Sequence, residues 1–344
     1  MPMKKAALIR GDGVGPELTE AALKVLEAVG TEIELIPVDA GYEWWRRHGG
    51  DSLIPRETWE ILEQVDAVLK APTTTPPEPG APKSVAVSIR QRFDLYANIR
   101  PIKTIGGLRG RLGPVDFICV REATEGLYSG IEHRITPDVA IACRKITRRQ
   151  SRRVARKAFE LARERGWKRI EVVTKRNIMK ECDGIFIEAV EEVSRDFPEI
   201  TYEEYYIDNM AQQLVKNPQR FNQSIILGTN LFMDIISEEA AALVASIGLV
   251  YSANMGDDYA MFEPAHGSAP KYKGLNKVNP TAMILSAAWM LGYLGERKKM
   301  EAIFKAVEEV IAEGKKVTYD LGGSAKTSEM AEAIAEKASK ILRR

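Results

Sequence analysis

Apolar positions along the chain follow two periods, and the two alternate almost from end to end. Residues 4–10 form a short apolar run that ends at glycines, as a buried strand does. Leu18, Ala22 and Val25 then recur at helical spacing until Gly30. The same alternation predicts further strands at 33–38, 65–71, 116–122, 169–175 and 223–229, and further helices at 57–64, from Ser88 to Leu95, around 154–162, around 185–193 and from Ile235 to Ile247. Such alternation indicates an α/β fold with much parallel sheet.

Two segments interrupt this alternation. Residues 73–82 are rich in proline and can continue neither a strand nor a helix, so we expect a loop there. The tail from 281 onward is predicted to be helical in two blocks, separated by a loop at 317–327.

The glycine-rich turn GDGVGPE at 11–17 lies between a predicted strand and a predicted helix. A dinucleotide fingerprint is GxGxxG, and Pro16 occupies the position of its third glycine. Glu34 or Asp39 lies about 20 residues on, where that fingerprint has its acidic residue, so the reading stays open. A tight turn from strand to helix is the favoured interpretation.

Composition narrows the class of protein. The 344 residues are 45% hydrophobic and 28% charged, which is typical of a globular chain, and the net charge of +1 argues against nucleic acid as a partner. No apolar run approaches the roughly 18 residues of a membrane span, and no signal peptide is recognisable. Cys119, Cys143 and Cys182 form no disulfide framework. These features predict a cytoplasmic protein.

The basic run at 144–157 is interpreted as a solvated helix face, rather than a phosphate or nucleic-acid patch, because no aromatic residues interleave it.

Three groups of residues suggest chemistry. Arg90, Arg100 and Arg121 flank segments rich in glycine and tyrosine, and guanidinium groups pair bidentately with carboxylates. Asp234 and Glu238 are four apart on a predicted helix, and with a third acid, Asp208 at a strand end, they suit Mg²⁺ or Mn²⁺. A solvated acidic helix face explains the same acids equally well.

The third group is the segment 263–274, which joins His266 to small residues and the pair Lys271 and Tyr272. Small residues let a backbone approach a ligand, and this pair could hold a phosphate. Taken alone, the segment could equally be a surface turn.

Nine segments together resemble the isocitrate/isopropylmalate dehydrogenase family of β-decarboxylating dehydrogenases, in its short prokaryotic form. They match in order and spacing: GDGVGPE, LKAPTTTP, the stretch from Ser84 to Pro101, REATEGLYSG, KRNIMK, IDNMAQQL, NLFMDIISEEAA, EPAHGSAPKYKGLNKVNPTAMILSAAWML and DLGGSA. The resemblance implies an α/β fold that is not a Rossmann fold. It implies a large domain from 1–95 and 246–344, which carries most of the cofactor site, and a small domain from 96–245, which carries a dimerisation arm. It also implies an active site in the cleft between them, completed across a homodimer, which in turn could pair as a dimer of dimers.

The resemblance also assigns roles to residues. Tyr128 is similar to the residue that protonates the enolate, and Lys175, from the neighbouring subunit, to the group that helps remove the hydroxyl proton. Substrate-binding positions are matched by Ser84, Arg90, Arg100 and Arg121. Metal ligands are matched by Asp208 (also from the neighbour) and Asp234, with Glu238 nearby. Cofactor-binding positions are matched by Lys70, Thr75, His266, Gly267, Lys271, Tyr272, Asn279, Tyr319 and Asp320. The implied reaction is metal-dependent oxidative decarboxylation of a 2-hydroxy acid with a 3-carboxylate.

Departures from the family pattern bear on the metal and the cofactor. Glu238 stands where the family usually has aspartate, so we expect weaker metal binding than with aspartate. Lys271, Tyr272 and Tyr319 are similar to the 2′-phosphate set of members that use NADP, whereas Gly323 and its DLGGSA segment are similar to members that use NAD. NADP is slightly favoured.

Substrate identity stays open between close alternatives. Ser84 and the segment TEGLYSGIEHR favour isocitrate or homoisocitrate, whereas the partly apolar set Lys83, Ala86 and Val87 keeps 3-isopropylmalate, or mixed activity, as an alternative. A noncatalytic regulatory subunit is disfavoured, because such chains lose the catalytic tyrosine, lysine or acids that are present here.

Overall fold

The structure, a computed structural model, describes residues 3–76, 78, 81–108 and 110–343. Its centre is one ten-stranded mixed sheet in the order β2-β1-β3-β12-β11-β4-β5-β10-β8-β9, and a separate two-stranded hairpin pairs β6 with β7. The strands are β1 (Lys5–Ile9), β2 (Glu34–Val38), β3 (Ala67–Lys70), β4 (Ala97–Lys103), β5 (Asp116–Glu122), β6 (Glu132–Thr136), β7 (Val139–Ala142), β8 (Arg169–Thr174), β9 (Thr201–Tyr206), β10 (Ser224–Gly228), β11 (Tyr251–Met255) and β12 (Ala260–Pro264).

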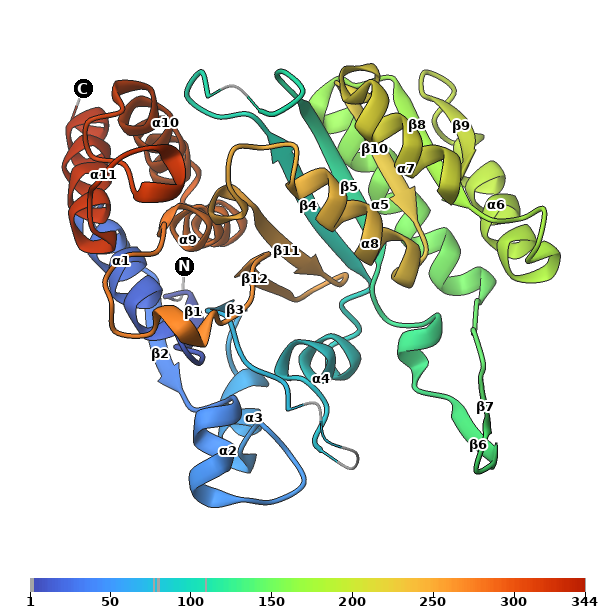
Figure 1. Cartoon of the computed structure of the whole chain (residues 1–344). Coiled ribbons are helices and arrows are strands. Elements are labelled where there is room, and N and C mark those ends of the chain that lie inside the picture. The colour runs from blue at the N-terminus through green and yellow to red at the C-terminus, as the bar shows by residue number, and fades with distance from the viewer. Residues whose placement is uncertain (1–2, 77, 79–80, 109, 344) are drawn as a thin grey trace.

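Helices flank this sheet (Figure 1). They are α1 (Gly15–Ala28), α2 (Tyr42–His48), α3 (Arg56–Leu62), α4 (Val85–Arg92), α5 (Arg148–Arg165), α6 (Lys180–Ser194), α7 (Ile207–Lys216), α8 (Asn230–Ala241), α9 (Thr281–Tyr293), α10 (Arg297–Glu313) and α11 (Thr327–Leu342). The expected α/β architecture is therefore confirmed. The strand pairs at both ends of the sheet are parallel, and the central pairs among β12, β11, β4 and β5 are antiparallel.

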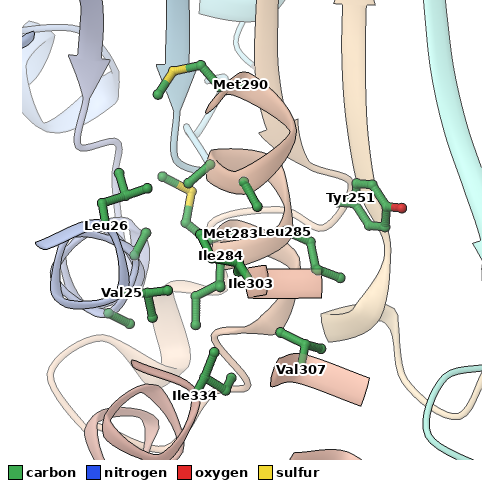
Figure 2. Packing of buried hydrophobic residues seen from close by; sticks show 14 of the residues in the cluster. Val25, Leu26, Tyr251, Met283, Ile284, Leu285, Met290, Ile303, Val307 and Ile334 are labelled. Carbon is green, nitrogen blue, oxygen red and sulfur yellow. The ribbon is translucent and has the colours of Figure 1, made fainter. Parts of the chain in front are cut away.

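The largest apolar core lies at the end of the sheet that holds both chain termini. There α1, α9, α10 and α11 pack together, and Val25, Ile284, Val307 and Ile334 converge between them (Figure 2). Helix α9 is apolar almost all round, as expected for a helix buried on several sides. Two further cores form at the other end, one beneath α5 and α6 and one beneath α7 and α8. The expected domain division at 1–95 with 246–344 and at 96–245 stays a prediction.

Several elements depart from the sequence predictions. Helix α4 begins after Ser84, whose Oγ accepts the backbone N–H of Val87 as an N-cap, and not at Ser88. Helix α8 runs from Asn230 to Ala241, so it both begins and ends several residues earlier than the predicted span from Ile235 to Ile247. The first block of the tail is two helices, because Gly295, at φ +106°, separates α9 from α10. Pro77, Pro79 and Gly80 of the expected loop lie outside the described residues.

The glycine-rich turn is a tight connection from β1 to α1, as favoured. Gly13 has φ +59°, and a Cβ there would come within 2.1 Å of the carbonyl oxygen of Ser268. Buried Asp12 accepts backbone N–H groups from Tyr42, Glu43 and Thr74 at 2.7 to 2.9 Å. The turn therefore joins three segments that are distant in sequence.

Two features of the surface bear on the sequence predictions. Exposed arginines of α5 pair with acids of neighbouring elements, for example Arg148 with Glu188 at 2.6 Å and Arg156 with Asp196 at 2.5 Å, which supports a solvated helix face. The β6–β7 hairpin projects from the body of the protein (Figure 1), and its strand residues are all exposed. Within the described part of the chain, no helix has the length and apolarity needed to cross a membrane.

Candidate active site

Three buried arginines converge on one face of the sheet. Arg90 lies on α4, Arg100 on β4 and Arg121 on β5, and each is at most 7% exposed. Burial lowers the pKa of Arg121, and the nearby positive charges of Arg90 and Arg100 lower it further. Arg121 on β5 lies opposite Asn98 on β4, two residues before Arg100, so Arg100 and Arg121 leave the same face of the sheet. The structure thus brings the three predicted carboxylate binders into one cluster.

Helix α8 presents two acids to this cluster. Asp234 forms an ion pair with Arg121, and Glu238 Oε1 lies 2.5 Å from Arg100 Nη1. Both acids keep a partly exposed side chain, with 34% and 46% accessible. The prediction that Asp234 and Glu238 share one helix face is confirmed by these contacts.

Tyr128 lies beside Arg121 and Asp234 of this cluster. It lies in a short 3₁₀ turn (Leu127–Ser129), donates a hydrogen bond to Asp234 Oδ2 at 2.8 Å, and its ring centroid is 4.9 Å from the Arg121 guanidinium carbon. Burial raises the pKa of Tyr128, and the hydrogen bond to Asp234 raises it further, although Arg121 opposes this. Tyr128 therefore holds its proton at neutral pH and can act as a proton donor.

Lys175 and Asp208 lie together elsewhere. Lys175 follows β8, Asp208 follows β9, and the Lys175 ammonium is 2.7 Å from Asp208 Oδ1. The hydrogen bond from Lys175 lowers the pKa of Asp208. Fully buried Asp183 accepts the backbone N–H of Lys175 at 2.6 Å and pairs with Arg144, so it fixes the turn that carries the lysine. Among the described residues, no hydrogen bond or ion pair joins Lys175 or Asp208 to Asp234 or Tyr128.

The predicted cofactor residues form a second group. Asn279 donates a hydrogen bond to Asp320 at 3.0 Å, and the rings of Tyr272 and Tyr319 stack with centroids 6.4 Å apart. Half-buried His266 has a pKa lowered by burial. The charge of Lys70 lowers this pKa further, whereas the charges of Asp320 and Glu238 oppose the shift, so His266 lies near Asp320 of the cofactor group and Glu238 of the arginine cluster.

The remaining predicted residues differ in their exposure and in their contacts. Gly267, Lys271 and Thr75 are exposed. Thr75 is preceded by Thr74, whose Oγ1 is 2.6 Å from Ser268 Oγ, so its loop lies against the loop that follows His266. Ser84 caps α4, and Lys70 is buried against Glu263.

Sequence reasoning missed the residues that hold the predicted ones in place. Asn230 accepts from Arg121 Nη2 at 2.7 Å, Glu263 pairs with Lys70 and Arg90, and Lys277 lies 4.6 Å above the Tyr319 ring. Glu263 and Lys277 both stand in the quoted segment 263–291, and an acid at the end of an apolar run was the available signal for Glu263.

Comparison with known proteins decides the family. The family model described as isocitrate/isopropylmalate dehydrogenase matches residues 5–334. The chain belongs to the isocitrate/isopropylmalate dehydrogenase family. It is similar to 3-isopropylmalate dehydrogenase of Methanothermobacter thermautotrophicus, with 42% identity over 97% of this chain and 98% of the relative. It is similar to isocitrate/homoisocitrate dehydrogenase of Thermus thermophilus, with 43% identity over 96% and 98%. A solved structure of isocitrate dehydrogenase from Methylococcus capsulatus superimposes with a TM-score of 0.93, at 40% identity over 98% of this chain and 100% of that one.

This member of the family is therefore an NAD(P)-dependent dehydrogenase that catalyses oxidative decarboxylation. Family members use NAD or NADP together with a divalent metal. Relatives of similar identity carry different substrate names, so membership alone does not fix the acid.

The residues present fit a hard divalent cation by their chemistry. Asp234 and Glu238 offer partly exposed carboxylate oxygens one helical turn apart, and oxygen is the ligand that Mg²⁺ and Mn²⁺ prefer. Within the described residues of a single chain, however, no group of three His, Cys, Asp or Glu side chains gathers around one point. The third predicted acid, Asp208, is turned to Lys175 instead.

Proposed function

We propose that this enzyme oxidises and decarboxylates isocitrate or homoisocitrate, with a preference for NADP over NAD, and that it acts as a homodimer. The observation that carries this proposal is the cluster of Arg90, Arg100 and Arg121 beside Tyr128. Three guanidinium groups in a buried site match an acid with several carboxylates, because each carboxylate can accept two parallel hydrogen bonds.

Arg90 has donors available for a substrate. Its Nη2 is 3.0 Å from Glu263 Oε1, whereas its Nε is buried with no hydrogen-bond partner among the described residues. A buried donor without a partner is costly unless a ligand supplies an acceptor. Ser84 stands at the start of the same helix, where its hydroxyl can donate to a distal carboxylate while still accepting from Val87.

One observation favours 3-isopropylmalate as the second candidate. Ala86 and Val87, in the first turn of α4, are partly exposed and apolar, which suits a branched alkyl group better than a carboxylate. The proposed order of preference is therefore isocitrate or homoisocitrate first, then 3-isopropylmalate.

When bound, the metal would polarise the substrate hydroxyl and its carboxylate, and the nicotinamide would accept the hydride. In the proposed mechanism, Lys175 from a second copy of the chain, acting as a neutral amine that has first released its own proton to solvent, accepts the hydroxyl proton. The arginines hold the carboxylates while the 3-carboxylate leaves as CO₂ and its electron pair stays on the substrate as an enolate. Tyr128 then donates its proton to the carbon that lost CO₂, which balances the reaction.

We propose that the metal is Mg²⁺ or Mn²⁺, held by Asp234 and Glu238 of one chain and Asp208 of another. We also propose that the projecting β6–β7 hairpin makes part of that dimer. Ile135, Val139 and Ile141 are 59%, 49% and 48% exposed on it, and apolar side chains at these levels on a two-stranded hairpin favour burial against a partner.

For the cofactor, we propose His266, Asn279 and Asp320 at the adenosine and Lys271, Tyr272 and Tyr319 at a 2′-phosphate. Lys277 strengthens this proposal, because its ammonium group lies at the same tyrosine ring. Lys273, by contrast, is paired with Glu43 at 2.6 Å and is less available to an anion.

A panel of reactions tests this function. Reduced-nicotinamide absorbance is followed with isocitrate, homoisocitrate, 3-isopropylmalate and tartrate, each with NAD or NADP and with or without Mg²⁺ or Mn²⁺. We expect metal-dependent reduction of NADP that is fastest with isocitrate or homoisocitrate. A higher kcat/KM for 3-isopropylmalate would contradict the proposed substrate, and silence with every acid would contradict the proposed function.

A further inference from the structure

We propose that Glu263 is a positioning residue, which fixes Lys70, Arg90 and, through Asn254 and Asn98, Arg100 relative to one another. This proposal rests on the proposed function, because it takes Arg90 and Arg100 as substrate-binding residues. It adds a residue that needs no contact with the substrate yet sets the geometry of those that do.

Glu263 binds two cations at once. It lies on β12 with 7% exposure, its Oε2 is 2.8 Å from the Lys70 ammonium on β3, and its Oε1 is 3.0 Å from Arg90 Nη2 on α4. A buried carboxylate with two partners fixes both of them in orientation, since leaving either unpaired in this environment is costly. Glu263 therefore orients Lys70 and the guanidinium plane of Arg90 together.

A chain of side-chain amides continues from Glu263 across the sheet. Asn254 on β11 donates to Glu263 Oε1 at 2.7 Å, and Asn98 on β4 donates to Asn254 Oδ1 at 2.8 Å. Arg100 Nε then donates to Asn98 Oδ1 at 3.0 Å. Asn98 and Asn254 lie directly opposite each other in the β4–β11 ladder, so the contact follows from the strand register.

Every link in this chain points the same way. Each residue from Arg100 to Asn254 donates to the next one, and the last acceptor is the carboxylate of Glu263. Both asparagine side chains are therefore fixed as donor on one end and acceptor on the other. The chain spans four neighbouring strands, β3, β12, β11 and β4, and it ends at an arginine whose Nη1 contacts Glu238 on α8.

Charge explains why this acid differs from the others in the site. Burial alone would raise the pKa of Glu263, but Lys70 and Arg90 outweigh that effect and lower it to about 2, so the carboxylate stays ionised. Asp234 and Glu238 are partly exposed and are proposed to bind metal, whereas Glu263 is enclosed by protein. Glu263 therefore keeps its cations ordered when the other two acids engage a metal.

Kinetics of Glu263→Gln, Asn98→Ser and the double variant test the proposal, with the acid on which the wild type is most active. Glutamine keeps the shape but presents no charge to Lys70 and Arg90. We expect each single variant to raise KM for the acid, Glu263→Gln by about tenfold or more and Asn98→Ser by about threefold. We expect KM for the nicotinamide cofactor to change less with Asn98→Ser than KM for the acid.

The double variant is the decisive arm, because among the described residues the hydrogen bonds that join Glu263 to Asn98 run through Asn254. If the chain transmits position, Asn98→Ser should have less than about half its effect on log(kcat/KM) when Glu263→Gln is already present. Multiplicative effects of the two substitutions would overturn the positioning role.

Two further variants keep the test interpretable. Glu171→Gln is the matched control, since Glu171 is an equally buried glutamate (3% exposed) on β8, and its kcat/KM should stay within about twofold of wild type. An equal effect of Glu171→Gln and Glu263→Gln would overturn the proposal.

If Glu263→Gln does not fold, Asn254→Ala leaves both ion pairs of Glu263 intact and should raise KM for the acid by about fivefold. An unchanged KM would overturn the proposal. A wild type silent with every acid overturns the proposed function and this role together, whereas an active wild type with multiplicative variants overturns only this role.

Discussion

The two halves of the candidate site differ in how far one chain builds them. The half around Arg121 is enclosed: its side chain is 3% exposed and is held by Asn230, Asp234 and the Tyr128 ring. The half around Lys175 is open, since Asp208 is 69% exposed and has Lys175 as its side-chain partner. One chain thus brings the three arginines together, but it does not bring Asp208 to Asp234 and Glu238. This difference is what we expect if a second copy of the chain completes the proposed metal site.

Position in the sheet accounts for this difference. Arg100 and Arg121 lie on β4 and β5 near the middle of the sheet, where helices cover them. Lys175 and Asp208 follow β8 and β9, the last two strands, whose carboxyl ends lie side by side because the strands are parallel. Asp208, at that outer edge, is 69% exposed and is therefore accessible to a neighbouring chain.

Mixing two inactive variants gives the largest expected effect. Tyr128→Phe and Lys175→Ala should each lower kcat by about 10³-fold, because each removes a proposed proton-transfer group. If Lys175 serves the partner's site, each mixed dimer has one intact site, and random exchange of subunits should restore about a quarter of wild-type activity. The measurement is dehydrogenase activity after denaturation and joint refolding.

The control is the same procedure on each variant alone, which should restore nothing. A mixture as inactive as its components would show that Tyr128 and Lys175 act within one chain, and the comparison between an enclosed half and a shared half would fail.

Sequence reasoning identified the candidate catalytic and binding residues, but it missed the residues that hold them in position. Arginines, tyrosine and acids stand out by type and spacing, and Asp234 and Glu238 do lie on one helix as predicted. Asn98, Asn254 and Glu263 were missed, because their pairing depends on the order β12-β11-β4, which joins strands far apart in the sequence. The polar residues on β4 also interrupt its apolar pattern, so this strand was not predicted at all.

Acid stability sharpens the contrast between the halves. The pKa of Glu263 is lowered from 4.5 to about 2, so its ion pairs stabilise the folded chain above pH 4.5 and this contribution is lost as the pH falls towards 2. The contribution at neutral pH is about 3 kcal/mol. The difference in unfolding free energy between wild type and Glu263→Gln, measured by urea titration, should therefore shrink as the pH falls from 5 to 2.5, by about that amount in the limit of full protonation.

Asp208→Asn is the matched comparison in this titration. Its carboxylate also has a lowered pKa, but it is exposed, so water and salt screen its pairing with Lys175. Stability of this variant should follow the wild type at every pH. A pH-dependent loss as large as that of Glu263→Gln would mean that the open half is enclosed in the folded protein.

A smaller effect is expected at the cofactor. Lys271→Ala should raise KM for NADP by about tenfold and leave KM for NAD unchanged, because only NADP carries the 2′-phosphate that the ammonium would pair with. Lys273→Ala is the matched control, since that lysine is paired with Glu43. The ratio of kcat/KM for the two cofactors measures the effect. A strong NAD preference in the wild type that survives Lys271→Ala would refute the phosphate role.

The smallest effect concerns metal affinity at the junction of the two halves. Glu238 reaches Arg100 at 2.5 Å through a side chain that is one methylene longer than that of an aspartate, so its carboxylate is already held by the enclosed half. Glu238→Asp should shorten that reach, free the carboxylate from Arg100 and lower Kd for Mn²⁺ by about threefold, as measured by metal titration of the apoprotein. Glu239→Asp, one residue further along α8, is the control and should leave Kd unchanged. Equal affinity of wild type and Glu238→Asp would mean that Glu238 binds the metal no less well than aspartate does, and that its contact with Arg100 gives way when metal enters.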